Sequence, residues 1–326
     1  MLSFFGIAAG LTLLVLGGTA LVAGASQLAV RLGVSPMIVG LTIVGFGTSA
    51  PELVVNIVGG LRGESALAFG NVVGSNISNL ALVLGAAALL QKIEIHGTVI
   101  RREVPLLLLI TTIIMAMALD NIFEGTPAQI GTSDAVILLL LFAIFVYIMM
   151  QDFLLARKKD KLLSEIDENP LVMTGPASRF YWAYIAVGFV LLFVGGEMTV
   201  RQSVAFAGEL GISTTIIGLF VVAVGTSLPE LITSVLAAWR KESDLALGNI
   251  LGSNVFNSLI VLPAGALTGS VPIPSGGVQD LIVTWLLSAA LIPIFLFGRA
   301  VLGRTSGALL LVAYFGYAIL RVLGYS

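Results

Sequence analysis

Apolar runs of roughly 20 residues recur along the whole chain, and short segments between them carry most of the charges. A run of this length suffices for a helix to cross the hydrocarbon core of a bilayer. The pattern predicts an all-α polytopic membrane protein whose first apolar run is a true transmembrane helix rather than a cleaved signal peptide. We place ten transmembrane helices at 4–30, 36–61, 66–90, 104–119, 132–151, 180–207, 214–239, 244–268, 279–298 and 305–323.

Composition agrees with this pattern, because 58% of the 326 residues are hydrophobic and only 10% are charged. A soluble domain carries about 25% charged residues. No basic tract suggests nucleic acid, and the absence of cysteine excludes disulfides, thiolate catalysis and cysteine-ligated zinc. The single histidine, His96, lies in the polar segment KIEIHGTVIRR, where we expect a solvated loop residue rather than a metal ligand.

The basic residues are divided unevenly between the two sides that alternating spans would create. Arg62, Arg201 and Arg321 fall on one side, and thirteen others fall on the opposite side. The positive-inside rule then places both termini outside the cytoplasm and the charged segment 152–178 inside it. We expect that segment to be a solvated linker, with a regulatory or lipid-surface role as the alternative. The thirteen are Arg31, Lys92, Arg101, Arg102, Arg157, Lys158, Lys159, Lys161, Arg179, Arg240, Lys241, Arg299 and Arg304.

A long internal repeat runs through the chain. GTSAPE at residues 47–52 recurs 178 residues later as GTSLPE at 225–230. At the same offset, residues 37–89 align without a gap on 215–267, with about half of the positions identical, and GNVVGSN falls on GNILGSN.

The chain is therefore interpreted as a duplicated five-helix unit, with a first repeat at 1–151, the linker at 152–178 and a second repeat at 179–326. Because five is odd, the second unit must enter the membrane from the opposite face. The predicted fold is a pair of inverted-topology repeats around a pseudo-two-fold axis in the membrane plane, an arrangement typical of secondary transporters.

The repeated hexapeptide combines helix disruption with oxygen ligands. Pro51 lacks an N–H and clashes with the carbonyl four residues back, so we expect a loosened helix with freed backbone carbonyls. Thr48 and Glu52 share a helical face and Ser49 lies beside them. Such an oxygen-only set favours hard cations such as Ca²⁺, Mg²⁺ and Na⁺.

The second repeated motif aligns polar side chains at a spacing of four. Asn71, Ser75 and Asn79 share one face of the third span, beside small residues that let a neighbouring helix approach closely. Packing between helices is the alternative role for such residues. Their counterparts in the second repeat are Asn249, Ser253 and Asn257.

Glu52 and Glu230 are intramembrane carboxylates, one from each repeat, and such residues are functional by default. Two unpaired carboxylates would repel each other. One Ca²⁺ neutralises both, and so would two or more Na⁺ or two protons, which is the physical basis of antiport. A third acid, Glu197, has no repeat partner, since Thr19 stands opposite, and we expect it to line an access path or lie near a helix end.

These motifs resemble the two α-repeats of the sodium/calcium exchanger family within the cation/Ca²⁺ antiporter superfamily, and look like its prokaryotic branch. The resemblance covers the full chain and implies Ca²⁺ extrusion by alternating access in exchange for Na⁺. It also implies that backbone carbonyls near Gly45 and Ala223 bind Na⁺. The implied site residues are Thr48, Ser49, Glu52, Ser75, Asn79, Thr226, Ser227, Glu230, Ser253 and Asn257.

One position departs from the family pattern. Members often carry Asp where this chain has Asn257, so the coupling ion and stoichiometry stay open, and H⁺/Ca²⁺ antiport is the alternative. A cation channel is a different-class alternative. A membrane enzyme lacks a nucleophile–base pair or a metal-binding His set. We expect no cofactor, a functional monomer in a prokaryotic plasma membrane, and only Ca²⁺, Na⁺ and the lipid bilayer as partners, with H⁺ as a further possible ion.

Overall fold

The computed structural model describes residues 2–63, 65–94, 99–119, 128–166, 180–209, 223–297 and 301–323, and His96 lies outside them. The described chain is helical almost throughout, as the apolar runs predict. Six of its helices are long and apolar enough to cross a membrane, or seven if the bent pair Pro36–Thr48 and Ala50–Leu61 counts as one span. A helix is the expected solution in lipid, because it satisfies every backbone polar group within the segment.

The described elements follow the predicted spans closely, and residues 214–222 of the predicted span 214–239 lie outside the described residues. The first half contains α1 (Leu2–Leu32), α2 (Pro36–Val39), the π-helix η1 (Gly40–Val44), α3 (Gly45–Thr48), α4 (Ala50–Leu61), α5 (Ala66–Ile77), η2 (Ser78–Val83), α6 (Leu84–Leu90), β1 (Ile93–Glu94), η3 (Val99–Glu103), α7 (Val104–Met117), β2 (Gln129–Ile130) and α9 (Thr132–Ile166). The second half contains α10 (Tyr181–Glu209), α12 (Ala223–Thr226), α13 (Leu228–Trp239), α14 (Ser243–Phe256), η5 (Asn257–Val261), α15 (Leu262–Thr268), β3 (Val271–Pro272), α16 (Gly277–Phe297), β4 (Val301–Leu302) and α17 (Arg304–Val322).

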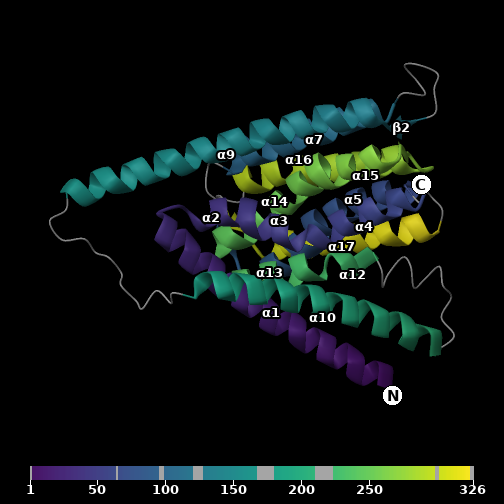
Figure 1. The fold of residues 1–326 in the computed structure, drawn as a ribbon, viewed down its shortest axis with the longest axis horizontal. Coiled ribbons are helices and arrows are strands. Elements are labelled where there is room, and N and C mark those ends of the chain that lie inside the picture. The colour runs from purple at the N-terminus through teal and green to yellow at the C-terminus, as the bar shows by residue number, and fades with distance from the viewer. Residues whose placement is uncertain are drawn as a thin grey trace.

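Helices α1 and α10 lie side by side along one flank of the molecule (Figure 1). Glycines let the two backbones touch, and they do so reciprocally. A Cβ on Gly17 would lie 2.9 Å from the carbonyl oxygen of Gly188, and a Cβ on Gly195 would lie 2.8 Å from that of Gly10. Since Gly10 and Gly17 correspond to Gly188 and Gly195 at the offset of 178, the two contacts are equivalent and the helices run antiparallel.

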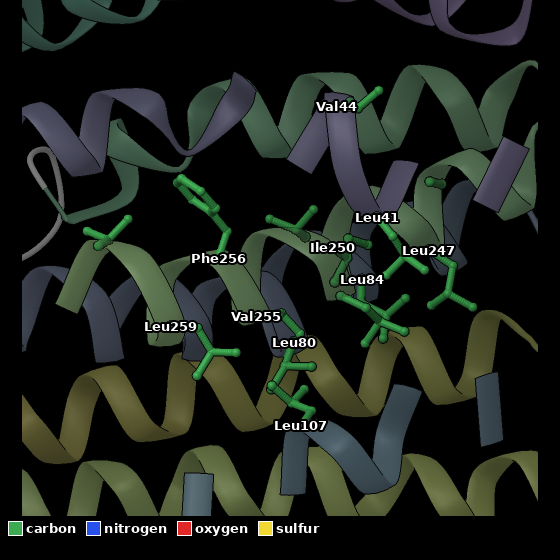
Figure 2. Close-up of a cluster of buried hydrophobic side chains, with 14 of the residues drawn as sticks. Leu41, Val44, Leu80, Leu84, Leu107, Leu247, Ile250, Val255, Phe256 and Leu259 are labelled. Atoms are coloured by element: carbon green, nitrogen blue, oxygen red, sulfur yellow. The ribbon is translucent and has the colours of Figure 1, made fainter. Parts of the chain in front are cut away.

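The core centres on α14, whose residues from Leu245 to Phe256 are all buried. Figure 2 shows Leu247, Ile250 and Val255 of this helix among buried apolar side chains that include Leu80 and Leu107. A helix buried on all sides cannot show an amphipathic pattern. Its polar residues are therefore held in a closely packed, apolar surrounding.

Four two-residue strands depart from the all-α expectation. β1 pairs antiparallel with β4, and β2 pairs antiparallel with β3. Each pair joins a connection of the first half to one of the second half. These extended segments lie between helix ends, where the backbone has no intrahelical partner and pairs across the two halves instead.

The predicted linker 152–178 also differs from expectation, because α9 continues unbroken as far as Ile166. In Figure 1 this end of α9 lies opposite the end of the molecule that holds both termini. Residues 167–179 lie outside the described part. The first part of the segment is thus helical and continuous with the preceding span.

Basic residues of the thirteen-member set gather around two adjoining cavities that share Asp244. Arg101 and Arg102 line one of about 790 Å³, and Lys92 and Lys241 line the other. The two cavities bring together residues from both halves that the alternation of spans assigns to one side.

Candidate cation site

Both hexapeptides interrupt their helices at the same residue. Ser49 has φ −86° and ψ 5°, and Ser227 has φ −86° and ψ 7°, so each leaves the helical region between a short helix and a longer one. The segments on either side of Ser49 are bent by 41°. The loosened helix predicted from Pro51 and Pro229 is confirmed, and its cause is the N–H that proline lacks.

The second motifs end in π-helical turns. Asn79 lies in η2, and Asn257 begins η5. Such turns are rare and frequently occur at functional sites. Sequence reasoning missed them, because a spacing of four presumes a regular α-helix as far as Asn79, whereas α5 ends at Ile77.

The carboxylates of Glu52 and Glu230 are buried, with 0% and 1% exposure, and lie close enough to interact electrostatically. Glu230 Oε1 accepts a hydrogen bond from Ser49 Oγ at 3.0 Å, across the two halves. Glu230 Oε2 and both carboxylate oxygens of Glu52 accept none. Ser75 lies beside Glu52. The two acids predicted to form one site are therefore brought together.

Thr48 connects the first hexapeptide to α14 of the second half. Its Oγ1 donates to Asn249 Oδ1 at 3.1 Å and lies 3.3 Å from Ser253 Oγ. Ser253 Oγ in turn donates to the carbonyl of Gly45 at 3.3 Å. Three predicted site residues, Thr48, Ser253 and Gly45, thus lie in direct contact.

Several other predicted residues leave buried oxygens without a partner. Asn79 Oδ1, Asn257 Oδ1, Ser75 Oγ and Ser227 Oγ are buried and form no hydrogen bond. Buried polar groups are otherwise almost always paired. Unpaired acceptors at residues of both repeated motifs are groups that an oxygen-coordinated cation would satisfy.

The remaining predicted residues lie less centrally. Thr226 is half-buried, and Ala223 is the first residue of α12. Glu197 is exposed on α10 and forms an ion pair with Arg201 one turn away, so it lies outside the site. A cavity of about 280 Å³ opens beside Thr48 and Pro229 and is otherwise lined mainly by apolar side chains.

Sequence reasoning also missed polar residues that support the motifs. Asn71 Nδ2 donates to Asn56 Oδ1 at 2.7 Å, and Asn249 Nδ2 donates to Ser234 Oγ at 2.9 Å. The two bonds occupy equivalent positions in the two halves. A signal was available, since Asn56 and Ser234 each follow the repeated glutamate by four residues and so share its helical face.

The donor set decides which metal ions fit. Within the described ranges, no group of three or more His, Cys, Asp or Glu residues could hold a metal ion. The cluster offers two carboxylates with hydroxyl, amide and carbonyl oxygens. Such ligands suit Ca²⁺ or Na⁺ and disfavour the softer transition metals.

Comparisons with known proteins agree with this site. The chain is 32% identical over 284 residues to the sodium/calcium exchanger MaX1 of Methanosarcina acetivorans, covering 79% of this chain and 81% of that protein. It is 36% identical over 264 residues to the inner membrane protein YrbG of Escherichia coli K12, covering 79% and 77%. The solved structure of the sodium-calcium exchanger NCX_Mj, soaked with 10 mM Na⁺ and zero Ca²⁺, superposes with a TM-score of 0.81 at 27% identity and covers 98% of both chains.

The family model described as sodium/calcium exchanger protein matches residues 2–151 and 180–323. These two stretches contain both hexapeptides, both buried glutamates and the asparagines that follow them. The matched region spans most of the chain and excludes only the segment between the two halves and the extreme ends. The chain belongs to the sodium/calcium exchanger family of membrane antiporters.

Proposed function

We propose that this chain exchanges Ca²⁺ for Na⁺ by alternating access and exports Ca²⁺, with Glu52 and Glu230 as the central ligands. The observation that carries the proposal is that both carboxylates and several residues of the repeated motifs have buried oxygens without hydrogen-bond partners. Leaving such groups unpaired in a buried site is costly unless a ligand compensates them. A cation removes that cost, and its release must be matched by entry of another.

The remaining ligands come from both halves. Thr48, Ser49, Ser75 and Asn79 would supply oxygens from the first half. Gly45 and Ala223 would contribute backbone carbonyls to Na⁺, since each lies one turn before the helix break. The second half would supply Thr226, Ser227, Ser253 and Asn257.

Charge balance explains the exchange. Two buried carboxylates carry two negative charges, and each uncompensated buried ion costs several kcal/mol. One Ca²⁺ neutralises the pair, and so do two Na⁺. The two cargoes therefore compete for one pair of charges, which couples the export of one to the import of the other.

We further propose ten transmembrane helices in two inverted repeats, 1–151 and 179–326, with both termini outside the cytoplasm and the chain acting as a monomer in a plasma membrane. The reciprocal glycine contacts of α1 and α10 support the inverted repeats. So does the strand pairing, in which β1 and β3 are equivalent and each pairs with a strand of the opposite half. The gathered basic residues support the sidedness.

Exchange of H⁺ for Ca²⁺ is the second candidate. It is favoured by the amides at Asn79 and Asn257, which leave the described cluster with two acids and no third. Two protons would neutralise the pair without any demand on the neutral ligands.

Transport by purified protein in proteoliposomes distinguishes these candidates. Vesicles loaded with Na⁺ and diluted into Na⁺-free buffer should take up ⁴⁵Ca²⁺, and collapsing the Na⁺ gradient should stop the uptake. Uptake that ignores Na⁺ but follows a pH gradient would replace Na⁺ by H⁺ in the proposal. Downhill Ca²⁺ flux with no counter-ion would indicate a channel.

A further inference from the structure

Two asparagines that adjoin the proposed ligands, Asn76 and Asn254, form a reciprocal pair of bonds across the halves. Asn79 Nδ2 donates to Asn254 Oδ1 at 3.1 Å, and Asn257 Nδ2 donates to Asn76 Oδ1 at 3.3 Å. The two bonds are equivalent at the offset of 178 residues. All four side chains are buried, with at most 4% exposure.

These bonds determine which end of each ligand amide is free. An asparagine amide is planar, with a donor NH₂ at one end and an acceptor oxygen at the other. Because the NH₂ groups of Asn79 and Asn257 are engaged, their Oδ1 atoms remain as free acceptors, and both lack a hydrogen-bond partner. In the reversed orientation the amide would present its NH₂ group, and this group cannot act as a ligand for the cation.

Resting on the proposed function, we propose that Asn254 and Asn76 are positioning residues, which hold Oδ1 of Asn79 and of Asn257 available to the transported cation. Neither needs to touch the ion. They act as outer partners of the ligands, and removing such partners from a metal site typically costs about 10–100-fold in affinity.

The two positioning residues are not equally held. Asn76 Nδ2 donates to Ser258 Oγ at 2.9 Å, whereas Asn254 Nδ2 is buried without a partner. The cause is visible in the sequence, because Leu80 occupies the position equivalent to Ser258. Asn76 is therefore fixed at both ends and Asn254 at one, so the orientation of Asn79 is the easier one to disturb.

The test uses Ca²⁺-induced thermal stabilisation of the full chain in detergent, because a ligand that binds the folded state raises its stability in proportion to binding. Asn254→Leu removes the acceptor in a similar volume and should raise the Ca²⁺ concentration for half-maximal stabilisation about 10-fold. Asn254→Asp keeps an acceptor for Asn79 and adds a negative charge, so it should not raise that concentration. Ser288→Ala removes a buried hydroxyl that bonds within α16. It should lower stability without changing the Ca²⁺ response.

A double-mutant cycle separates positioning from packing. If Asn254 acts through Asn79, Asn254→Leu should cost no further Ca²⁺ affinity in an Asn79→Ala background, whereas independent structural effects would add. Additive effects, or unchanged affinity in Asn254→Leu while the wild type binds Ca²⁺, would overturn the positioning role alone. A wild-type chain that responds to neither Ca²⁺ nor Na⁺ would overturn the proposed function as well. Should Asn254→Leu not fold, Asn254→Ala removes the same acceptor.

Discussion

The two hexapeptides have nearly the same sequence but different surroundings. Thr48 is buried and contacts Asn249 and Ser253, whereas Thr226 is half-buried. Ser49 donates to the carboxylate of the opposite half, whereas Ser227 Oγ has no partner. The difference lies in conformation, because the residue types are the same.

Two equivalent glycines, Gly252 of α14 and Gly74 of α5, differ in the space around them. The first arm, Pro36–Thr48, packs onto α14 so closely that a Cβ on Gly252 would lie 2.6 Å from the carbonyl oxygen of Leu41. The equivalent glycine of α5, Gly74, would meet no described atom within 4 Å. Of the second arm, residues 214–226, the structure describes only α12.

In the inverted repeats that we propose, a difference between the two hexapeptides is what would allow the site to open on one side at a time. Among the described residues, the same sequence pattern gives a buried Thr48 with two hydroxyl and amide contacts in one half and a half-buried Thr226 in the other. Exchanging the two arrangements would reverse the side from which the carboxylates are reached. A ligand can drive such an exchange only through its differential affinity for the two states.

The largest expected effect comes from removing the charge of one of the two buried carboxylates, Glu52 or Glu230. Glu52→Gln or Glu230→Gln should reduce Ca²⁺ exchange below about 1% of wild type, because loss of one charged partner in a buried site costs about 3–5 kcal/mol and 1.4 kcal/mol is tenfold. Na⁺-driven ⁴⁵Ca²⁺ uptake measures this. Glu197→Gln, which removes an exposed carboxylate from α10, is the matched control and should transport normally. Near-normal transport by either buried variant would remove the paired-carboxylate model.

Equivalent glycines provide the next test. Gly252→Ala should lower stability by about 1–3 kcal/mol, because the new methyl overlaps the backbone of Leu41. Gly74→Ala should instead stabilise the described state by up to about 1 kcal/mol, as Ala is the better helix former. Thermal unfolding without added ions measures both.

Transport measurements on the Gly74→Ala variant provide a second test of the same two glycines. If α5 must receive the second arm as closely as α14 receives the first, Gly74→Ala should slow exchange despite its unchanged or higher stability. Equal loss of stability in the two variants would show that Gly252 and Gly74 do not differ in the space around them. Full exchange by Gly74→Ala would show that the second arm never closes onto α5.

The hydroxyls of the two hexapeptides should give a smaller contrast. Thr48→Val breaks a buried bond to Asn249 and leaves that acceptor unpaired, which costs about 1–3 kcal/mol. Thr226→Val, at a half-buried position, should cost less than about 0.5 kcal/mol. Chemical denaturation of the ion-free protein in detergent measures the two values, and equal values would contradict the difference in environment.

The sequence predicted the helical fold, most helix bounds and the approach of Glu52 to Glu230, because apolar run length and duplicated motifs are properties of the chain itself. It did not predict the π-helical turns or the pairing of Asn79 with Asn254, since both depend on how α5 and α14 meet. The pairing of Glu197 with Arg201 on an exposed face of α10 was not predicted either, because a polar residue at span depth does not reveal which face it occupies. The different surroundings of Thr48 and Thr226 are likewise invisible in sequences that are nearly identical.

The smallest expected effect concerns the amides, where the two halves match. Asn257→Asp adds a third acid to a cluster whose two carboxylates one Ca²⁺ already neutralises, so a further cation or proton must accompany the ion. Exchange should persist, with its dependence on Na⁺ concentration or on pH altered. Asn79→Asp adds the same charge from the other half and is the matched variant. If charge alone sets the coupling, both should shift the dependence in the same direction. If only one does, the position of the acid decides which cation replaces Ca²⁺, and if neither does, the amide is neutral for coupling.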